Sequence, residues 1–389
     1  MVQSPRDASL AYRAAVRAPT SWASFAGRLA TDVVECVDLE VAPERLRDPG
    51  PWFVVVDFEA FGRGGRARAW RFAHVTAGGP PERGDDPAAG WSGPAPDDWA
   101  TSMSQEVYEA AVRRVQQHIR QGDVYQVNVC RVLSAPLPAT DPGTGSGEPD
   151  AAALAARLAA GNPAPYGAAV HVPAGLDVAP VWVVSASPEL YLALEDGRLA
   201  SGPIKGTAPT ADGLSGKDRA ENVMITDLVR NDLQRVCEPG TVEVTELLGV
   251  EEHPGLVHLV SRVQGTLTSA VAAAPDRWRH LLRATFPPGS VSGAPKSSAL
   301  SIIDDLEPTA RGPYCGAVGW VDGDRAELAV GIRTFWWERG ADDDGTLRFG
   351  TGAGITWGSD AAAEWRETEL KAARLVGLAS GDPAHRPDR

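Results

Sequence analysis

The sequence has few cysteines and few basic side chains, and these two shortages exclude several classes of protein. Its four cysteines (Cys36, Cys130, Cys237 and Cys315) are far apart among 389 residues and form no Cys-x-x-Cys pair. A disulfide framework or a zinc ribbon is therefore not expected. Lys and Arg number 37 against 51 Asp and Glu, a formal charge of −14. Nucleic acid and anionic membranes attract cationic surfaces, so nonspecific binding to either is not expected.

Long apolar runs are also missing. No stretch approaches the roughly 18 apolar residues of a membrane span, and no apolar N-terminal run precedes a small-residue cleavage site. These absences favour a reduced, cytoplasmic protein.

The composition that remains is that of a folded protein with many turns. Hydrophobic residues make up 43% and charged residues 23%, with 41 Gly and 31 Pro. Residues 78–98 are rich in Pro, Gly and Asp and predict a long loop that ends an N-terminal region, 1–99. A second loop is expected at 136–150. The main domain is predicted over 100–378, followed by a disordered tail, 379–389.

Between the loops, helical and strand patterns alternate irregularly. Val107, Ala111, Val115 and Ile119 recur every fourth residue before Gly122, which indicates a helix with a glycine stop. Further helices are predicted over 218–235, 278–285, 296–306 and 361–375. Period-two patterns predict strands that start near residues 124, 181, 241, 316, 328 and 347. This arrangement indicates an α+β protein with large antiparallel sheets.

The segment SGPIKGT (201–207) presents Lys205 beside Gly206, which would let a ligand approach the backbone. Such an amine could act as a nucleophile or transfer a proton. A solvated turn lysine is the alternative and the commoner case for a lone lysine, so this residue decides little by itself.

Two helical segments carry carboxylates with metal-ligand spacing. In AEWRETELK (363–371), Glu364 and Glu367 lie one turn apart, with Lys371 on the same stripe. Paired carboxylates suit Mg²⁺, although a Glu367–Lys371 surface ion pair is the alternative. The segment 217–232 contains Glu221 and allows the same two interpretations.

Two glycine-rich loops, 287–296 and 350–354, could bring backbone amides to a ligand. The first loop precedes a helix start with Lys296 beside it, which would suit an anion such as a carboxylate. A plain sharp turn is the alternative.

Taken in order, these segments resemble the chorismate-utilising enzymes, the family that includes the first components of anthranilate and aminodeoxychorismate synthases, isochorismate synthase and salicylate synthase. The resemblance implies a chorismate-binding, anthranilate synthase component I-like fold: stacked antiparallel sheets flanked by helices, with chorismate and Mg²⁺ in a deep cleft. It covers about residues 107–375 and is carried by GDVYQVN (122–128), SASPEL (185–190), PIKGT (203–207), DRAENVMITDLVRND (218–232), HLVSRVQG (258–265), FPPGSVSGAPK (286–296), IIDDLEP (302–308), RGPYCGAVGW (311–320), GIRTF (331–335), GAGI (352–355) and AEWRETELK (363–371).

The resemblance also implies roles for individual residues. Lys205 is the expected nucleophile, Glu189 the acid that protonates the departing C4 hydroxyl, and His258 a histidine near the reacting ring. The expected magnesium ligands and substrate contacts are Glu221, Glu364 and Glu367 for the metal, and Gln126, Thr207, Ser292, Tyr314, Arg333, Gly352, Ala353, Gly354 and Lys371 for chorismate.

Two positions discriminate among the family's reactions. Water-adding members have a lysine where this chain has Gln126, and anthranilate synthases usually have alanine at Lys205. The resemblance therefore implies an aminodeoxychorismate synthase, which serves para-aminobenzoate and folate synthesis. Because no cysteine lies in a Gly-x-Cys-x-Gly context, the chain should depend on a separate glutamine amidotransferase for ammonia, or on free ammonia. Anthranilate synthase component I and a non-catalytic chorismate-binding subunit are the alternatives.

Overall fold

The computed structural model describes residues 21–81, 90–139, 147–208, 210–253, 256–340 and 344–380. The helices are α1 (Gln105–Gln121), α2 (Ala151–Gly161), α3 (Gly216–Gln234), α4 (Ser269–Ala273), α5 (Arg277–Thr285), α6 (Lys296–Leu306) and α7 (Ala361–Ser380). The strands are β1 (Trp22–Phe25), β2 (Arg28–Asp38), β3 (Trp52–Val56), β4 (Ala67–Ala77), β5 (Ala100–Thr101), β6 (Gln126–Pro136), β7 (Tyr166–Val172), β8 (Val181–Ser187), β9 (Leu190–Glu195), β10 (Arg198–Gly202), β11 (Ile204–Ala208), β12 (Glu243–His253), β13 (Leu256–Thr266), β14 (Gly293–Ala294), β15 (Ala317–Asp322), β16 (Arg325–Val330), β17 (Thr334–Arg339) and β18 (Gly345–Ile355).

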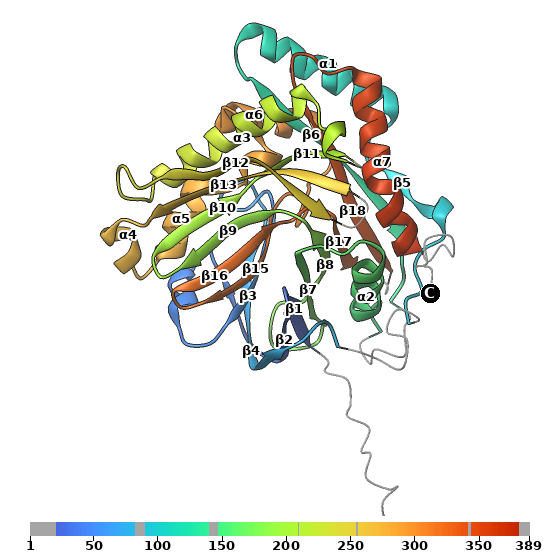
Figure 1. The fold of residues 1–389 in the computed structure, drawn as a ribbon. Helices are drawn as coiled ribbons and strands as arrows, with labels where there is room; N and C mark the ends of the chain where they lie inside the picture. Colours follow the sequence, from blue (N-terminus) through green and yellow to red (C-terminus); the bar gives the residue numbers. More distant parts are fainter. Residues whose placement is uncertain are drawn as a thin grey trace, which may run out of the picture.

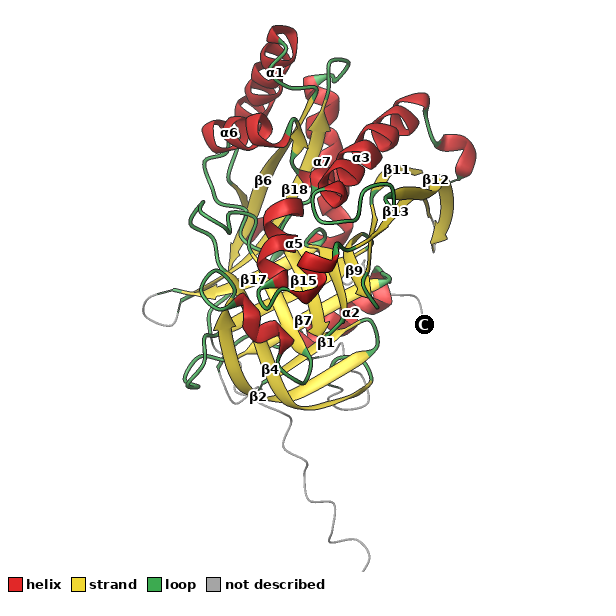
Figure 2. Cartoon of the chain, turned by 90° about the vertical axis from the view of Figure 1, so that its left-hand side faces the viewer, coloured by secondary structure: helices red, strands yellow, loops and turns green. Residues whose placement is uncertain are grey.

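Antiparallel pairing joins strands that are distant in sequence. The N-terminal strands β1 and β3 pair with β7 and β15, while β16 pairs with β9 and β18 runs along β6. Helices α1, α3, α6 and α7 gather at one end of the molecule, and β1, β2, β4 and β7 lie toward the other (Figures 1 and 2). The predicted α+β class with large antiparallel sheets and flanking helices is confirmed.

The core consists of aromatic and branched side chains from both the early and the late strands. Trp52 and Phe53 of β3 are fully buried, as is Trp278 of α5. Burial of large apolar side chains between the layers is the main source of stability for such a fold.

The helices predicted from the sequence all form. The observed elements differ from the sequence-based predictions at three other places. The strand expected from Leu328 is interrupted between β16 and β17, because Arg333 adopts a left-handed backbone with φ 54°. Helix α7 continues to Ser380, so Ala379 and Ser380 are buried rather than part of a tail. Helix α2 was not predicted, because its alanine-rich sequence carries little amphipathic signal.

The predicted loop 78–98 buries more than its composition suggests. Trp91 is 6% exposed, and its indole N–H donates to the carbonyl of Ala379. Residues 82–89, 140–146 and 381–389 of the predicted loops and tail lie outside the described residues.

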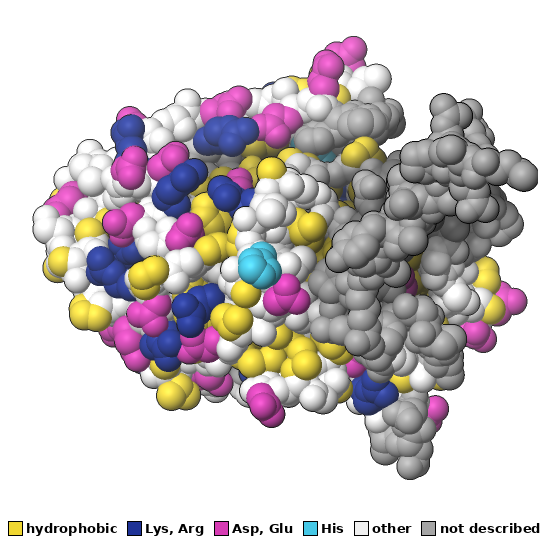
Figure 3. Space-filling view, turned by 90° about the horizontal axis from the view of Figure 1, so that it is seen from below, with side chains coloured by type: hydrophobic (Ala, Val, Ile, Leu, Met, Phe, Trp, Pro, Cys, Tyr) yellow, Lys and Arg dark blue, Asp and Glu magenta, His cyan; other side chains and the backbone are white. Residues whose placement is uncertain are grey.

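The described surface mixes both signs of charge. On the face seen from below, Lys and Arg side chains are interspersed with Asp and Glu (Figure 3). Within the described ranges, no helix combines the length and the apolarity needed to cross a membrane.

Candidate functional site

The site is built on the long β6–β18 pair. Strand β18 also pairs with β17, but only as far as Phe349, whereas its pairing with β6 continues to Ile355. In the part of the chain that the structure describes, the segment 350–355 therefore has a strand partner on one edge only. Its other edge leaves backbone polar groups available to a ligand.

Three polar side chains converge on Gly354 of this segment. A Cβ placed on Gly354 would lie 2.8 Å from Gln126 Nε2, 2.8 Å from Lys205 Nζ and 3.0 Å from Asn128 Oδ1. Gln126 is fully buried, and neither of its amide atoms has a hydrogen-bond partner in the described structure. A buried amide without partners is costly, so this corner is suited to receive a polar ligand.

Gly206 brings Lys205 close to helix α3. Its φ is 84°, and a Cβ there would lie 2.7 Å from the Cβ of Asp218. Only glycine tolerates both the left-handed backbone and the close approach. The result is that Lys205 Nζ lies 3.6 Å from Glu221 Oε2.

Glu189 follows β8 and is 4% exposed. Burial raises the pKa of its carboxyl to about 7, although a hydrogen bond from Ser290 and the charge of Lys205 both oppose the rise. A carboxyl that is still protonated near neutral pH can act as a general acid. Asn128 supports this arrangement, because its Nδ2 donates to the carbonyl of Ser290 at 2.7 Å.

Three carboxylates face lysines rather than one another. Lys217 Nζ lies 3.2 Å from Glu364 Oε1 and 3.7 Å from Glu221 Oε1. Lys371 Nζ lies 2.6 Å from Glu367 Oε1 and donates to the carbonyl of Gly352 at 3.1 Å. The ion pairs expected as the alternative for these helices therefore do form, whereas the metal-ligand interpretation stays a prediction.

The carboxylate oxygens of Glu221, Glu364 and Glu367 are donors of the kind that a magnesium ion prefers. Glu221 Oε1 is buried without a hydrogen bond, and hard oxygen donors are what Mg²⁺ prefers. Burial alone would raise the pKa of Glu367, but Lys371, Lys205 and Lys217 outweigh burial and lower this pKa. Within the described ranges, however, no three His, Cys, Asp or Glu side chains are already gathered as a metal site.

Arg333 offers a second positive group. It lies in the break between β16 and β17, where its carbonyl accepts from Ala186 N at 3.0 Å. The guanidinium has no ion-pair partner among the described residues, and burial lowers its pKa. A half-buried cation held by a left-handed backbone can receive a carboxylate.

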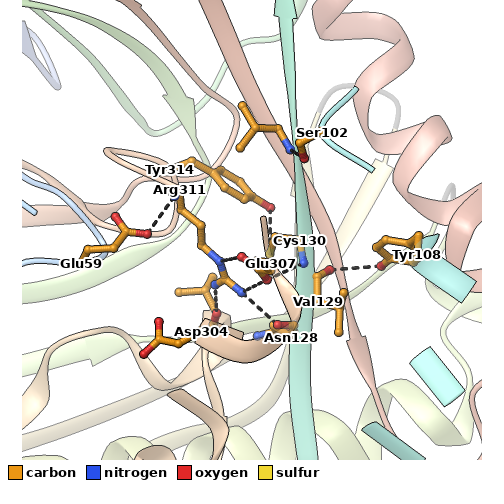
Figure 4. A network of polar contacts seen from close by, with 12 residues as sticks. Glu59, Ser102, Tyr108, Asn128, Val129, Cys130, Asp304, Glu307, Arg311 and Tyr314 are labelled. Carbon is orange, nitrogen blue, oxygen red and sulfur yellow. Dashed lines mark hydrogen bonds and ion pairs between the residues drawn. The ribbon is translucent and has the colours of Figure 1, made fainter. Parts of the chain in front are cut away.

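Tyr314 and Ser292 pack behind the β6–β18 pair. The Tyr314 ring lies against Gly350, and its hydroxyl accepts from Cys130 Sγ at 3.9 Å. Tyr314 and Cys130 belong to the network around Arg311 (Figure 4). The Ser292 hydroxyl donates to the carbonyl of Pro288 at 3.0 Å, so only its acceptor capacity remains for a ligand.

The remaining residues that were expected at the site lie on strands β11, β13 and β18. His258 is buried on β13 opposite Thr207, whose side chain lies outside the described part of the structure. Ala353 is 3% exposed and belongs to the core, so only its backbone can serve a ligand. A Cβ on Gly352 would clash with Cys130 Sγ at 2.5 Å, which means that packing against β6 also requires this glycine.

The sequence interpretation missed two site residues and the partner of a third. Asn128 follows Gln126 at strand spacing, and Lys217 precedes Glu221 by one helical turn, so periodicity could have revealed both. Lys296 was expected beside an anion at the helix start. Its Nζ lies 2.6 Å from Asp232 Oδ2 and donates to the carbonyl of Thr285, so the carboxylate beside it belongs to the protein itself.

The chain is similar in sequence to proteins of two kinds. The chain is 38% identical over 292 residues to aminodeoxychorismate synthase component 1 of Klebsiella aerogenes, covering 72% of this chain and 59% of that protein. It is 39% identical over 302 residues to anthranilate synthase component 1 of Haloferax volcanii, covering 74% and 52%. The chain thus spans little more than half the length of these relatives.

The fold also matches solved structures. Anthranilate synthase component I from Streptococcus pneumoniae aligns with a TM-score of 0.71 at 21% identity, covering 97% of this chain and 95% of that one. A putative 2,3-dihydroxybenzoate-specific isochorismate synthase from Bacillus anthracis aligns with a TM-score of 0.70 at 22% identity, covering 94% and 96%. Residues 6–377 match the family described as chorismate binding enzyme, and the chain belongs to that family.

Proposed function

We propose that the chain is an aminodeoxychorismate synthase component that converts chorismate and ammonia into 4-amino-4-deoxychorismate and water. The observation that carries this proposal is the placement of Lys205 Nζ beside the unpartnered amide of Gln126 at Gly354. A family member that adds water would have a lysine at Gln126, and an anthranilate synthase would usually lack Lys205.

Substrate binding follows from the charges. Chorismate is a dianion that an enzyme of charge −14 would repel as a whole, so local cations must hold it. Arg333 would take one carboxylate in a bidentate pair, and the free edge of β18 would donate backbone N–H groups. Glu221, Glu364 and Glu367 would hold Mg²⁺, which when bound supplies positive charge for the other carboxylate.

The chemistry then needs an acid and a nucleophile. Glu189 would protonate the C4 hydroxyl as it leaves, because its raised pKa keeps a proton available near neutral pH. Deprotonated Lys205 would attack C2 as the C4–O bond breaks, with the ring double bonds shifting. Ammonia would then bond to C4 while the C2–N bond to Lys205 breaks, and the enolpyruvyl group would stay in place.

The ammonia source would be a separate protein. The bacterial relatives are named component 1, which is consistent with a glutamine amidotransferase as the second component. Supply of para-aminobenzoate for folate and a cytoplasmic location stay predictions.

The alternative function is that of anthranilate synthase component I. It is favoured by the 39% identical relative from Haloferax volcanii and by the sequence GAGI at 352–355, a form more common in anthranilate synthases. Lys205 favours aminodeoxychorismate, since formation of anthranilate needs no attack at C2 by a lysine.

Product identification tests the proposal. The purified chain is incubated with chorismate, Mg²⁺ and ammonium, and the product is analysed by mass spectrometry before and after addition of the separate lyase. We expect aminodeoxychorismate and then para-aminobenzoate. Anthranilate formed directly would overturn the assignment, and chorismate binding without turnover would favour a non-catalytic subunit. Lys205→Ala should form no aminodeoxychorismate, whereas unchanged turnover would remove its covalent role.

A further inference from the structure

Lys217 occupies a position in helix α3 at which a lysine is electrostatically unfavourable. It is the second residue of α3, whose start is fixed by a capping box between Ser215 and Asp218. A positive charge at a helix N-terminus opposes the helix dipole. A lysine that precedes a glutamate by four residues is also the weaker orientation of such a pair. The reason for this lysine must therefore lie outside its own helix.

The partners of Lys217 are the carboxylates expected to bind metal. Its ammonium lies 3.2 Å from Glu364 Oε1 on α7 and 3.7 Å from Glu221 Oε1 on α3. Glu364 and Glu221 are 4% and 14% exposed at their side chains, whereas Lys217 is 50% exposed. The lysine stem thus lies at the surface, and its charged end reaches two buried oxygens from two helices.

The Lys217 ammonium does not satisfy both carboxylate oxygens. Glu221 Oε1 is buried and makes no hydrogen bond, although Lys217 is its ion-pair partner. A magnesium ion binds oxygen at about 2.0–2.1 Å, so each oxygen would have to come more than about 1 Å closer to the cation.

We propose that the Lys217 ammonium is an internal substitute for the metal, which Mg²⁺ must displace from Glu221 and Glu364. This inference rests on the metal site of the proposed function. The two cations compete for the same Oε1 atoms, so they exclude each other. Lys205 differs, since it contacts the other oxygen of Glu221, Oε2, and can stay when Lys217 leaves. Because the Lys217 stem is exposed, its departure needs only a change of side-chain rotamer.

The test is calorimetric titration of Mg²⁺ into the full chain without chorismate. Lys217→Met keeps an unbranched side chain of similar length and removes its charge. We expect it to bind Mg²⁺ about three- to tenfold more tightly than the wild type, because no internal ion pair has to break. Without metal Lys217→Met should melt at a lower temperature than the wild type, because Glu364 loses its ion pair with Lys217 and Glu221 keeps only the one with Lys205. Added Mg²⁺ should therefore raise the Tm of the variant by more than that of the wild type.

Two control variants separate competition from other effects. Arg219→Met removes the same charge from an exposed position two residues along α3, and it should change the Mg²⁺ affinity by less than about twofold. Lys217→Arg retains a cation and should bind Mg²⁺ no more tightly than the wild type. If Lys217→Met bound Mg²⁺ as tightly as the wild type or more weakly, this inference would be overturned, but the metal site of the proposed function would not. No Mg²⁺ binding by either the wild type or Lys217→Met would overturn both the metal site and this inference.

Discussion

Lys205 Nζ lies 3.6 Å from Glu221 Oε2, so the expected nucleophile and an expected metal ligand form one ion pair between β11 and α3. An amine attacks carbon through its nitrogen lone pair, so the contact between Lys205 and Glu221 must break before Lys205 can react. The two groups are held together by the close packing of α3 on Gly206. The nucleophile and the carboxylates therefore form one coupled site rather than two independent ones.

Gly354→Ala should impair catalysis much more than stability. The added Cβ would lie 2.8 Å from both Gln126 Nε2 and Lys205 Nζ, which are the mobile ends of flexible side chains. Both ends can move away at little cost to folding, but a displacement of about 1 Å in a catalytic group can lower the rate about a hundredfold. We expect a loss of kcat/KM of that order with a Tm within a few degrees of the wild type, measured by product formation and thermal melting.

Gly358→Ala is the matched control, because a Cβ there has no heavy atom within 4 Å. It should leave both the rate and the Tm near those of the wild type. If Gly354→Ala retained full activity, the convergence of side chains at this glycine would have no role in turnover.

The rate should depend on the protonation of Glu189. The raised pKa of about 7 means that the acid form is abundant below pH 7 and is lost above it. We expect kcat to fall about tenfold per pH unit well above 7 and to be about 10²- to 10⁴-fold lower in Glu189→Gln. A rate that stays constant from pH 6 to pH 9 would exclude Glu189 as the proton donor.

The raised pKa of Glu189 also predicts that its contribution to stability depends on pH. Its pKa is about 4.5 when exposed in the unfolded chain and about 7 when folded, so the folded state binds the proton more tightly. The stability that this proton provides is fully present below pH 4.5 and is lost as the pH rises through 7. Glu189→Gln cannot ionise, so its unfolding free energy relative to the wild type should rise by up to about 3 kcal/mol between pH 4.5 and pH 8. Urea unfolding at both pH values measures the change. A pH-independent difference would contradict it.

Much of the site could be predicted from the sequence, because its residues lie in short contiguous motifs. Lys205 and Gly206 are adjacent, and Glu364, Glu367 and Lys371 share a helical stripe. Helical periods also predicted α3 and α6, since each buries one consistent face, whereas β6 was predicted from its β-branched run and is buried on both faces.

Long-range pairing could not be predicted in this way. The contact between Lys217 and Glu364 joins α3 to α7, 147 residues apart in sequence, and no local pattern encodes it. The break at Arg333 was missed because the apolar run continues through a residue whose left-handed φ is imposed by its neighbours. The partner of Lys296 could not be predicted, because Asp232 lies on another helix.

The network behind the site should be essential for stability. Arg311 is 1% exposed, donates to both carboxylate oxygens of Glu307, and reaches the carbonyls of Asn128 and Val291 (Figure 4). Arg311→Met would leave the Glu307 carboxylate buried without its cation. Loss of one partner of a buried pair costs about 3–5 kcal/mol, and we expect the unfolding free energy to fall by that amount in urea denaturation.

An exposed pair provides the control for Arg311. Arg230 and Asp227 on α3 form an ion pair with side chains 41% and 56% exposed. Arg230→Met should cost less than about 1 kcal/mol, because water replaces the lost partner. If both variants lost the same free energy, burial would not be what makes the Arg311–Glu307 pair important. Arg311→Met should also lower activity under conditions where the variant is still folded, since Asn128 would lose one of the contacts that fix β6 beside Gly354.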